Sequence, residues 1–157
     1  MISLPDEAEL AIRAEGERAY PDECCGALLG GFDGESGKIV KAILPIGNSS
    51  ETAERFHRFT IGPGDFMRAE REAKARNMDL IGFYHSHPDH PAEPSDYDLE
   101  HALPFYSYVI VAVEQGAASG LTSWEMSADR ARFLRESQNQ GQNLEAPPRT
   151  PQGDQSP

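Results

Sequence analysis

The sequence is short of cysteine and of long apolar runs, and each shortage excludes a class of protein. Its 157 residues include two cysteines, the neighbours Cys24 and Cys25. Adjacent cysteines are geometrically awkward to bridge, so a disulfide framework is excluded, and so is a four-cysteine zinc site. No apolar run approaches the roughly 20 residues that span a bilayer, so we expect no membrane partner.

Basic residues are also scarce. Lys and Arg number 14 against 26 Asp and Glu, which gives a formal net charge of −12. An acidic surface repels phosphate backbones, so we expect no nucleic-acid partner. Residues 1–7 turn acidic at once and lack the basic start and apolar stretch of a secretory signal. Together with the cysteine usage, these features predict a cytoplasmic protein.

Apolar runs separated by helical patterns indicate the fold class. Tyr108–Val113 has the pattern of a buried strand, and Leu80–His85 that of a central one. A helix is predicted to begin near Pro5, because proline suits the first helical turn and the acids after it complement the helix dipole. Further helices are expected at 63–76 and 95–103, and further strands at 24–30, 38–44, 56–61 and 120–126. Strands interspersed with helices predict an α/β (mixed α+β) layer fold.

The composition changes near the C-terminal end. From Ser137 to Pro157 the aliphatic side chains are Leu144, Ala146 and prolines, set among Gln, Asn and Gly. Such a segment cannot bury enough apolar surface to offset the entropy of ordering it. We therefore predict one domain over residues 1–136 and a disordered Gln/Pro-rich tail over residues 137–157.

Two histidines lie one residue apart at the end of the predicted central strand. Strand side chains alternate between faces, so His85 and His87 project the same way, about 7 Å apart along the strand. Pro88 ends the strand by removing a backbone donor, and the acid-rich segment after it can bring a carboxylate to the same place. Two imidazoles and one carboxylate leave a tetrahedral zinc ion with an open position, as in catalytic zinc sites.

Taken singly, these features also have simpler interpretations. A His-x-His pair alone is weak evidence for a metal. Ser95 and Asp98 have the spacing of a helix capping box, which by itself requires no ion. The acids of residues 89–100 could form a solvated face. Glu23 could be an ordinary loop carboxylate, and Asp22 beside it is a rival candidate for a base.

The elements together resemble the metalloprotease motif of the JAMM (MPN+, Mov34/JAB1) family. That motif is a Glu, then His-x-His-Pro, then Ser-x-x-Asp after a short spacer. Residues 85–88 read His-Ser-His-Pro and residues 95–98 read Ser-Asp-Tyr-Asp. Residues 20–30 look like the Glu-bearing segment of small bacterial members. The resemblance covers roughly residues 4–126.

The resemblance implies a role for each residue of the motif. His85, His87 and Asp98 match the zinc ligands. Glu23 matches the general base, and Ser95 matches the serine that helps to stabilise the oxyanion. The implied fold is a mixed β-sheet flanked by helices, the cytidine-deaminase-like JAB1/MPN fold.

The resemblance further implies a zinc metallopeptidase with Zn²⁺ as its cofactor. Small bacterial members act on ubiquitin-like sulfur carrier proteins of the ThiS or MoaD type, which end in Gly-Gly. We therefore expect hydrolysis of the peptide or isopeptide bond after that C-terminal Gly-Gly. A metallopeptidase on other peptides and a non-catalytic MPN-type binding scaffold remain open alternatives. Family members often dimerise, which makes a homodimer a further expectation.

Overall fold

The described part of the chain folds into a mixed sheet with helices on its faces. This computed structural model describes residues 1–35, 37–47 and 61–139. The helices of these residues are α1 (Asp6–Ala19), α2 (Pro63–Ala75) and α3 (Asp96–His101). Their strands are β1 (Ile2–Ser3), β2 (Cys25–Asp33), β3 (Gly37–Ile46), β4 (Asp79–Pro88), β5 (Ser107–Glu114), β6 (Ala117–Met126), β7 (Phe133–Glu136) and β8 (Gln138–Asn139). The predicted mixed α+β fold is confirmed.

The strands follow the order β7-β6-β5-β4-β2-β3-β1-β8. Strand β4 lies between β2, with which it pairs antiparallel, and β5, with which it pairs parallel. The sequence predicted β4 to be central because Leu80–His85 is almost continuously apolar, and strands buried on both faces have that pattern. The end of β4, where the histidines stand, is therefore supported from both sides.

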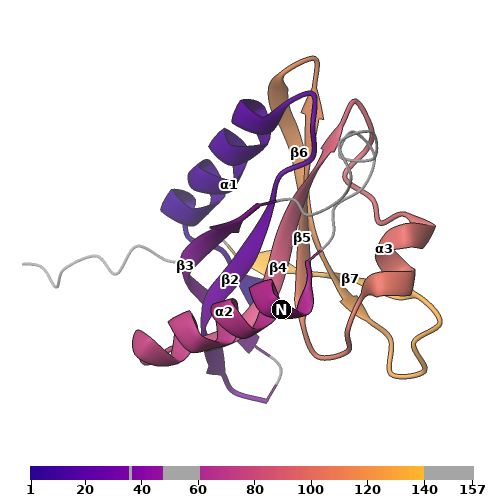
Figure 1. Ribbon diagram of the computed structural model, residues 1–157. Coiled ribbons are helices and arrows are strands. Elements are labelled where there is room, and N and C mark those ends of the chain that lie inside the picture. Colours follow the sequence, from indigo (N-terminus) through magenta and orange to yellow (C-terminus); the bar gives the residue numbers. More distant parts are fainter. Residues whose placement is uncertain (36, 48–60, 140–157) are drawn as a thin grey trace, which may run out of the picture.

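Helices cover both faces of the sheet. On one face, Ile12 of α1 packs into a core that includes Val111 of β5. On the other, Ala69 of α2 packs into a second core with Phe83 of β4. Figure 1 shows α1 and α3 on different sides of the strands, with α2 crossing β2 and β4. The residues between β4 and α3 thus lie near the end of the central strands.

The helices begin and end close to the predicted residues. Pro5 is the N-cap residue of α1, and Pro63 occupies the first turn of α2. Asn77, the residue after the C-cap residue of α2, has a φ of 55°, the left-handed conformation that asparagine tolerates at helix ends. Gly16 of α1 is buried, and a Cβ there would meet Val113 Cγ2 at 2.9 Å, so glycine allows α1 to lie close to the sheet. No helix among the described residues has the length and apolar character needed to cross a membrane.

Short strands at the edges were not predicted. β1, β7 and β8 hold two to four residues each, too few to show a hydrophobic period. The strand predicted at 56–61 lies outside the described residues except for Ile61, which is not in a strand. The chain also continues as β8 beyond the predicted domain end at residue 136. Backbone hydrogen bonds from Ile2 to Ser137 and from Leu4 to Asn139 hold it, which needs no apolar side chain. Residues 140–157 of the predicted tail lie outside the described residues.

A buried polar network joins strands from the two halves of the sheet order. Lys38 Nζ of β3 donates to Ser107 Oγ of β5 at 2.9 Å and to Glu125 Oε1 of β6 at 2.7 Å. Ser107 Oγ and Ser123 Oγ both donate to Oε1 of Glu136, at 2.8 and 2.9 Å. β7 and β8 are separated only by Ser137, yet they stand at opposite ends of the strand order. The segment 133–139 therefore brings the two edges of a strongly curved sheet together.

Candidate metal centre and active site

Strand β4 presents both histidines of the motif on one face. His85 and His87 are buried, with 1% and 7% of their surface exposed. Their Nε2 atoms are 3.0 Å apart. The separation along the strand predicted from the sequence was about 7 Å between residues, so the two rings tilt toward each other to reach this distance. Two imidazole nitrogens therefore converge on one point.

Asp98 reaches the same point from α3. Its Oδ2 lies 3.4 Å from His85 Nε2 and 3.3 Å from His87 Nε2. Asp98 is the third residue of α3, and Ser95 is the N-cap residue of that helix. These three side chains are a group of potential metal ligands whose donor atoms all lie within 4.8 Å of one another. The structure thus brings together the three residues that match the zinc ligands of the family motif.

The spacing of the donor atoms suits a tetrahedral zinc ion. Ligands 2.0–2.1 Å from such an ion lie about 3.3–3.4 Å from each other. The three pairwise separations here are 3.0, 3.3 and 3.4 Å. Two nitrogens and one oxygen are also a common donor set for zinc, with a fourth position left for water or substrate. The residues present therefore fit the ion that the family resemblance implies.

The loop after β4 orients His87. Its Nδ1 is 2.9 Å from the carbonyl oxygen of Pro91, so Nδ1–H donates there, and Nε2 is the nitrogen that faces His85 and Asp98. Thr122 Oγ1 of β6 donates to the carbonyl oxygen of Ala92 and accepts from Trp124 Nε1 at 2.8 Å. The loop that holds His87 is thereby fixed to β6.

The protonation of these groups follows from their burial and from each other. Burial disfavours the charged form of His85 and lowers its pKa. Burial also opposes the charged form of His87, but hydrogen bonds to Asp98 and Pro91 outweigh it and raise the pKa of His87. For Asp98, burial raises the pKa, yet the charge and hydrogen bonds of the two histidines dominate and hold that pKa well below its usual range. Asp98 is therefore an ionised carboxylate, and the lowered pKa of His85 favours its neutral imidazole, which can offer a lone pair.

Glu23 is buried beside this cluster. It lies in the segment between α1 and β2, with 6% of its surface exposed. Burial raises its pKa to about 8, with His87 lowering and Asp98 raising it to smaller extents. Glu23, His87 and Ser95 line the same cleft, which has a volume of about 340 Å³. Asp22, the rival base, is exposed, so Glu23 is the carboxyl group that the fold places at the cluster.

Ser86, between the two histidines, anchors the segment that carries Glu23. Its Oγ accepts the Cys24 N–H at 2.8 Å, and its own N–H donates to the Cys24 carbonyl at 3.1 Å. Ser86 is completely buried. Sequence analysis missed this residue, although its place between His85 and His87 was a signal. Its side chain lies on the α1 face, opposite the histidines, where β2 begins.

The sequence left two possible functions for Ser95, helix capping and donation to a substrate oxygen, and its position allows both. Its Oγ accepts the Asp98 N–H at 3.1 Å, and its N–H donates to Asp98 Oδ2 at 2.8 Å, which is a complete capping box. A hydroxyl that accepts one hydrogen bond still carries a proton that it can donate. Because Ser95 also lines the cleft with Glu23, capping the helix and donating to a substrate oxygen are compatible.

The cysteines have the properties of packing residues. Both are buried and free of disulfides. Burial raises the pKa of Cys24 to about 11 and that of Cys25 to about 12. A nucleophilic cysteine requires a lowered pKa, so neither thiol is set up for nucleophilic attack.

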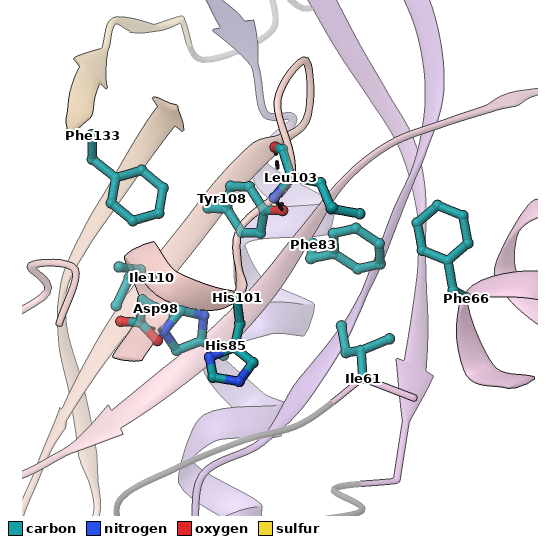
Figure 2. A pocket seen from close by; sticks show the side chains of 10 residues that line it. All are labelled: Ile61, Phe66, Phe83, His85, Asp98, His101, Leu103, Tyr108, Ile110 and Phe133. Atoms are coloured by element: carbon teal, nitrogen blue, oxygen red, sulfur yellow. Dashed lines mark hydrogen bonds and ion pairs between the residues drawn. The ribbon is translucent and has the colours of Figure 1, made fainter. Parts of the chain in front are cut away.

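An apolar pocket of about 110 Å³ adjoins the cluster on another side. Figure 2 shows His85 and Asp98 beside its aromatic and aliphatic lining. Its ten lining residues come from several elements: Ile61, Phe66, Phe83, His85, Asp98, His101, Leu103, Tyr108, Ile110 and Phe133. None of them lines the cleft that contains Glu23. The cluster thus contributes to two separate cavities of different chemistry.

Known proteins share this sequence pattern and fold. A family model described as prokaryotic homologs of the JAB domain matches residues 5–127. The desampylase of Haloferax volcanii is 31% identical over 115 residues, which cover 73% of this chain and 76% of that protein. The solution structure of a Salinibacter ruber protein is 39% identical, with a TM-score of 0.71, and the match covers 94% of this chain and 95% of that one.

A more distant structure agrees in fold alone. The crystal structure of a JAB1/MPN domain protein from Archaeoglobus fulgidus is 19% identical, with a TM-score of 0.50, and the match covers 87% of this chain and 96% of that one. The family model spans the whole motif from Glu23 to Asp98 together with the strands that carry it. The chain therefore belongs to the family of prokaryotic homologs of the JAB domain.

Proposed function

We propose that this protein is a zinc-dependent metallopeptidase or isopeptidase that hydrolyses the bond after the C-terminal Gly-Gly of a ubiquitin-like sulfur carrier. The observation that carries the proposal is the arrangement of His85, His87 and Asp98, whose donor atoms are 3.0–3.4 Å apart. A buried carboxyl group, Glu23, lies in the cleft that His87 also lines. A structural zinc site has no use for an additional buried acid, whereas hydrolysis needs one.

Each residue has a defined part in the proposed reaction. His85, His87 and Asp98 would hold the zinc ion. When bound, zinc supplies Lewis acidity, which makes a water molecule easier to deprotonate and polarises the scissile carbonyl. Glu23 takes a proton from that water and delivers it to the nitrogen of the leaving amine as the carbon–nitrogen bond breaks. Burial raises the pKa of Glu23 from its ordinary acidic range toward neutrality, which suits a carboxyl group that must both accept and release a proton.

Ser95 acts on the oxygen of the attacked carbonyl. Its O–H can donate to the negative charge that develops there, while its Oγ still accepts the Asp98 N–H. Removing one donor of this kind costs on the order of 10²–10³ in turnover. Since Ser95 occupies the N-cap position of α3, its hydroxyl is held in place before substrate arrives.

The choice of substrate rests on the family and its relatives. The similarity to a desampylase supports a hydrolase rather than a scaffold. A diglycine tail has no side chains, so it can be bound as an extended strand in a narrow cleft beside the metal. We therefore propose a ubiquitin-like carrier that ends in Gly-Gly as the substrate.

The test is cleavage of a carrier of the ThiS or MoaD type that carries one added residue, or a lysine isopeptide, beyond Gly-Gly. Zinc-loaded protein should release the intact carrier ending in Gly-Gly, as measured by intact-mass spectrometry. Glu23→Gln should bind zinc equally and cleave at least 10²-fold more slowly. If neither protein cleaves any such carrier although both bind zinc, the substrate assignment is wrong. Cleavage of unrelated peptides by the zinc-loaded protein would then favour a general metallopeptidase. A protein that fails to bind zinc even when zinc is supplied, and that cleaves nothing, would favour a binding scaffold.

A further inference from the structure

The apolar pocket beside His85 and Asp98 is not used by the proposed chemistry. The general base Glu23 and the oxyanion donor Ser95 both line the other cavity. The cluster contributes His85 and Asp98 to the apolar pocket and His87 to the cleft with Glu23. A substrate held at the cluster can therefore extend into both cavities at once.

The pocket is built from rings that hold one another in place. Phe83 of β4 lies 5.9 Å from Phe66 of α2 and 6.0 Å from Tyr108 of β5, measured between ring centroids. Tyr108 in turn meets Phe133 of β7 edge-on at 5.7 Å. Each ring belongs to a different element and packs against the next (Figure 2). The pocket is therefore formed before any ligand arrives.

Tyr108 supplies the one phenol among the residues that line the pocket, and its hydroxyl is hydrogen-bonded to the backbone of Leu103. The Leu103 N–H donates to Tyr108 Oη at 2.7 Å, and that hydroxyl donates to the Leu103 carbonyl oxygen at 3.5 Å. His101 Nδ1 is 2.9 Å from the Tyr97 carbonyl oxygen, and its ring stacks on Tyr97 at 4.0 Å. The remaining surface is aliphatic and aromatic carbon, apart from the cluster itself. Such a surface favours an apolar group over a charged one.

The volume limits the size of that group. A cavity of about 150 Å³ holds a benzene molecule, and this pocket measures about 110 Å³. It therefore suits one branched aliphatic side chain and is too small for a large aromatic ring system.

The position of Glu23 decides which part of the substrate enters the apolar pocket. Glu23 delivers a proton to the leaving amine, so the leaving group lies in the cleft that Glu23 lines. The chain on the other side of the scissile bond then continues past His85 and Asp98 toward the pocket. Two glycines offer no side chain, and in an extended strand the residue before them lies about 6.6 Å from the last glycine.

From these relations we infer that the apolar pocket is a specificity subsite for an aliphatic side chain immediately before the substrate's Gly-Gly. The inference rests on the proposed function and narrows its substrate class to protein tails that end in an aliphatic residue followed by two glycines. Leu103 is the pocket residue best suited to alter this preference, because 39% of its surface is exposed at the rim.

The experiment uses acetyl-Xaa-Gly-Gly peptides linked to 7-amino-4-methylcoumarin, with Leu, Ala, Arg or Asp as Xaa, and full-length zinc-loaded protein. We expect kcat/KM for Leu to exceed that for Asp and Arg at least tenfold, mainly through KM. Leu103→Asp should lower kcat/KM for Leu at least tenfold and raise it for Arg. Leu134→Asp is the matched control, because Leu134 is 47% exposed on β7, outside the pocket, and this variant should keep the order of the original protein.

A second measurement separates this inference from the proposed function. In metal-free protein, acetyl-Leu-Gly-Gly should shift the methyl NMR signals of Ile61, Leu103 and Ile110, and acetyl-Asp-Gly-Gly should not. If no peptide is cleaved but these signals shift, the subsite stands and the proposed hydrolysis is wrong. If all four peptides are cleaved equally and Leu103→Asp changes nothing, the subsite is wrong and the hydrolysis stands. Absence of both cleavage and methyl shifts would overturn the two together.

Discussion

Ser95 and Asp98 hold each other through two reciprocal hydrogen bonds, and one oxygen of that pair also faces the histidines. The Ser95 N–H donates to Asp98 Oδ2 at 2.8 Å, and this same oxygen lies 3.3 Å from His87 Nε2. The capping box of α3 therefore aims the carboxylate at the cluster before any ion binds. Helix stability and the geometry of the candidate metal site depend on the same contact.

Replacing Ser95 with alanine should separate the helix cap from the oxyanion donor. The Asp98 N–H loses its acceptor, so we expect a loss of about 1 kcal/mol in the free energy of unfolding. Zinc content should stay near one per chain, because the backbone N–H of residue 95 still holds Asp98 Oδ2. Turnover should fall by on the order of 10²–10³. Calorimetry, elemental analysis and carrier cleavage measure the three quantities.

Ser127→Ala is the matched control for this variant. Ser127 Oγ accepts the Arg132 N–H and donates to Asp129, in a turn whose residues do not line the cleft that contains Glu23. This control should lose a similar amount of stability and keep its turnover. Equal turnover in Ser95→Ala and the original protein would remove Ser95 from the reaction.

Zinc should raise the melting temperature of the protein, and this rise should require His85 as a ligand. An ion present at 100 times its Kd stabilises the folded state by about 2.7 kcal/mol, because it binds the native protein and not the unfolded chain. His85→Gln should abolish the zinc-dependent rise seen by calorimetry and lower the zinc content. His101→Gln is the control, because His101 lines the same pocket as His85 but bonds to Tyr97. A zinc response that survives in His85→Gln would contradict the assigned ligands.

Glu23 should make the metal-free protein less stable as the pH rises. Its pKa is raised by burial to about 8 from an ordinary 4.5. Between these values the native state holds a proton that the unfolded chain has released, so the free energy of unfolding falls with rising pH. Glu23→Gln lacks this titration. We expect its stability relative to the original protein to increase by about 3 kcal/mol from pH 4.5 to pH 7.

Denaturant unfolding of both proteins in the presence of a chelator measures this difference at each pH. The comparison cancels the titration of groups that the two proteins share. A difference that stays constant across pH 4.5–8 would show that Glu23 is not held in a desolvated position.

Ser86→Ala should weaken the anchor of the Glu23 segment. The Cys24 N–H would lose its acceptor in a buried position, which costs about 1–3 kcal/mol. Outer-shell partners of metal ligands typically contribute 10–100-fold to activity. We expect a decrease of similar size in kcat, with zinc content unchanged, because Ser86 holds the segment that carries Glu23. Ser123→Ala is the control, because Ser123 is equally buried and bonds to Glu136 away from the cleft. If Ser86→Ala and its control lose stability alike and neither loses activity, Ser86 has only a structural role.

The central strand and the first two helices were predictable because their signals are local. The apolar run before His85 identified β4, and alternation of strand side chains predicted that His85 and His87 share a face. Pro63 and the residues after it identified α2 to within one residue of its observed end. Signals of this kind depend on neighbours in the sequence, and the fold agrees with them.

The edge strands and the apolar pocket were not predictable in this way. β1 and β8 hold two residues each and are stabilised by backbone hydrogen bonds to each other and to β3, which carry no side-chain signature. The pocket is formed by rings from α2, β4, β5 and β7. Residues this far apart in the chain become neighbours only when the elements pack.

The sequence by itself determined which side chains can do chemistry: a pair of histidines on one strand face, a serine and an aspartate at capping distance, and a glutamate before an apolar strand. Periodicity and motif spacing are properties of the chain, so no coordinates were needed for them. The tertiary structure alone decided that Asp98 Oδ2 lies within 3.4 Å of both imidazoles and that Glu23 is withdrawn from water. Distances between separate segments and the loss of hydration arise only when β2 pairs with β4 and the loop before α3 closes over the end of the sheet.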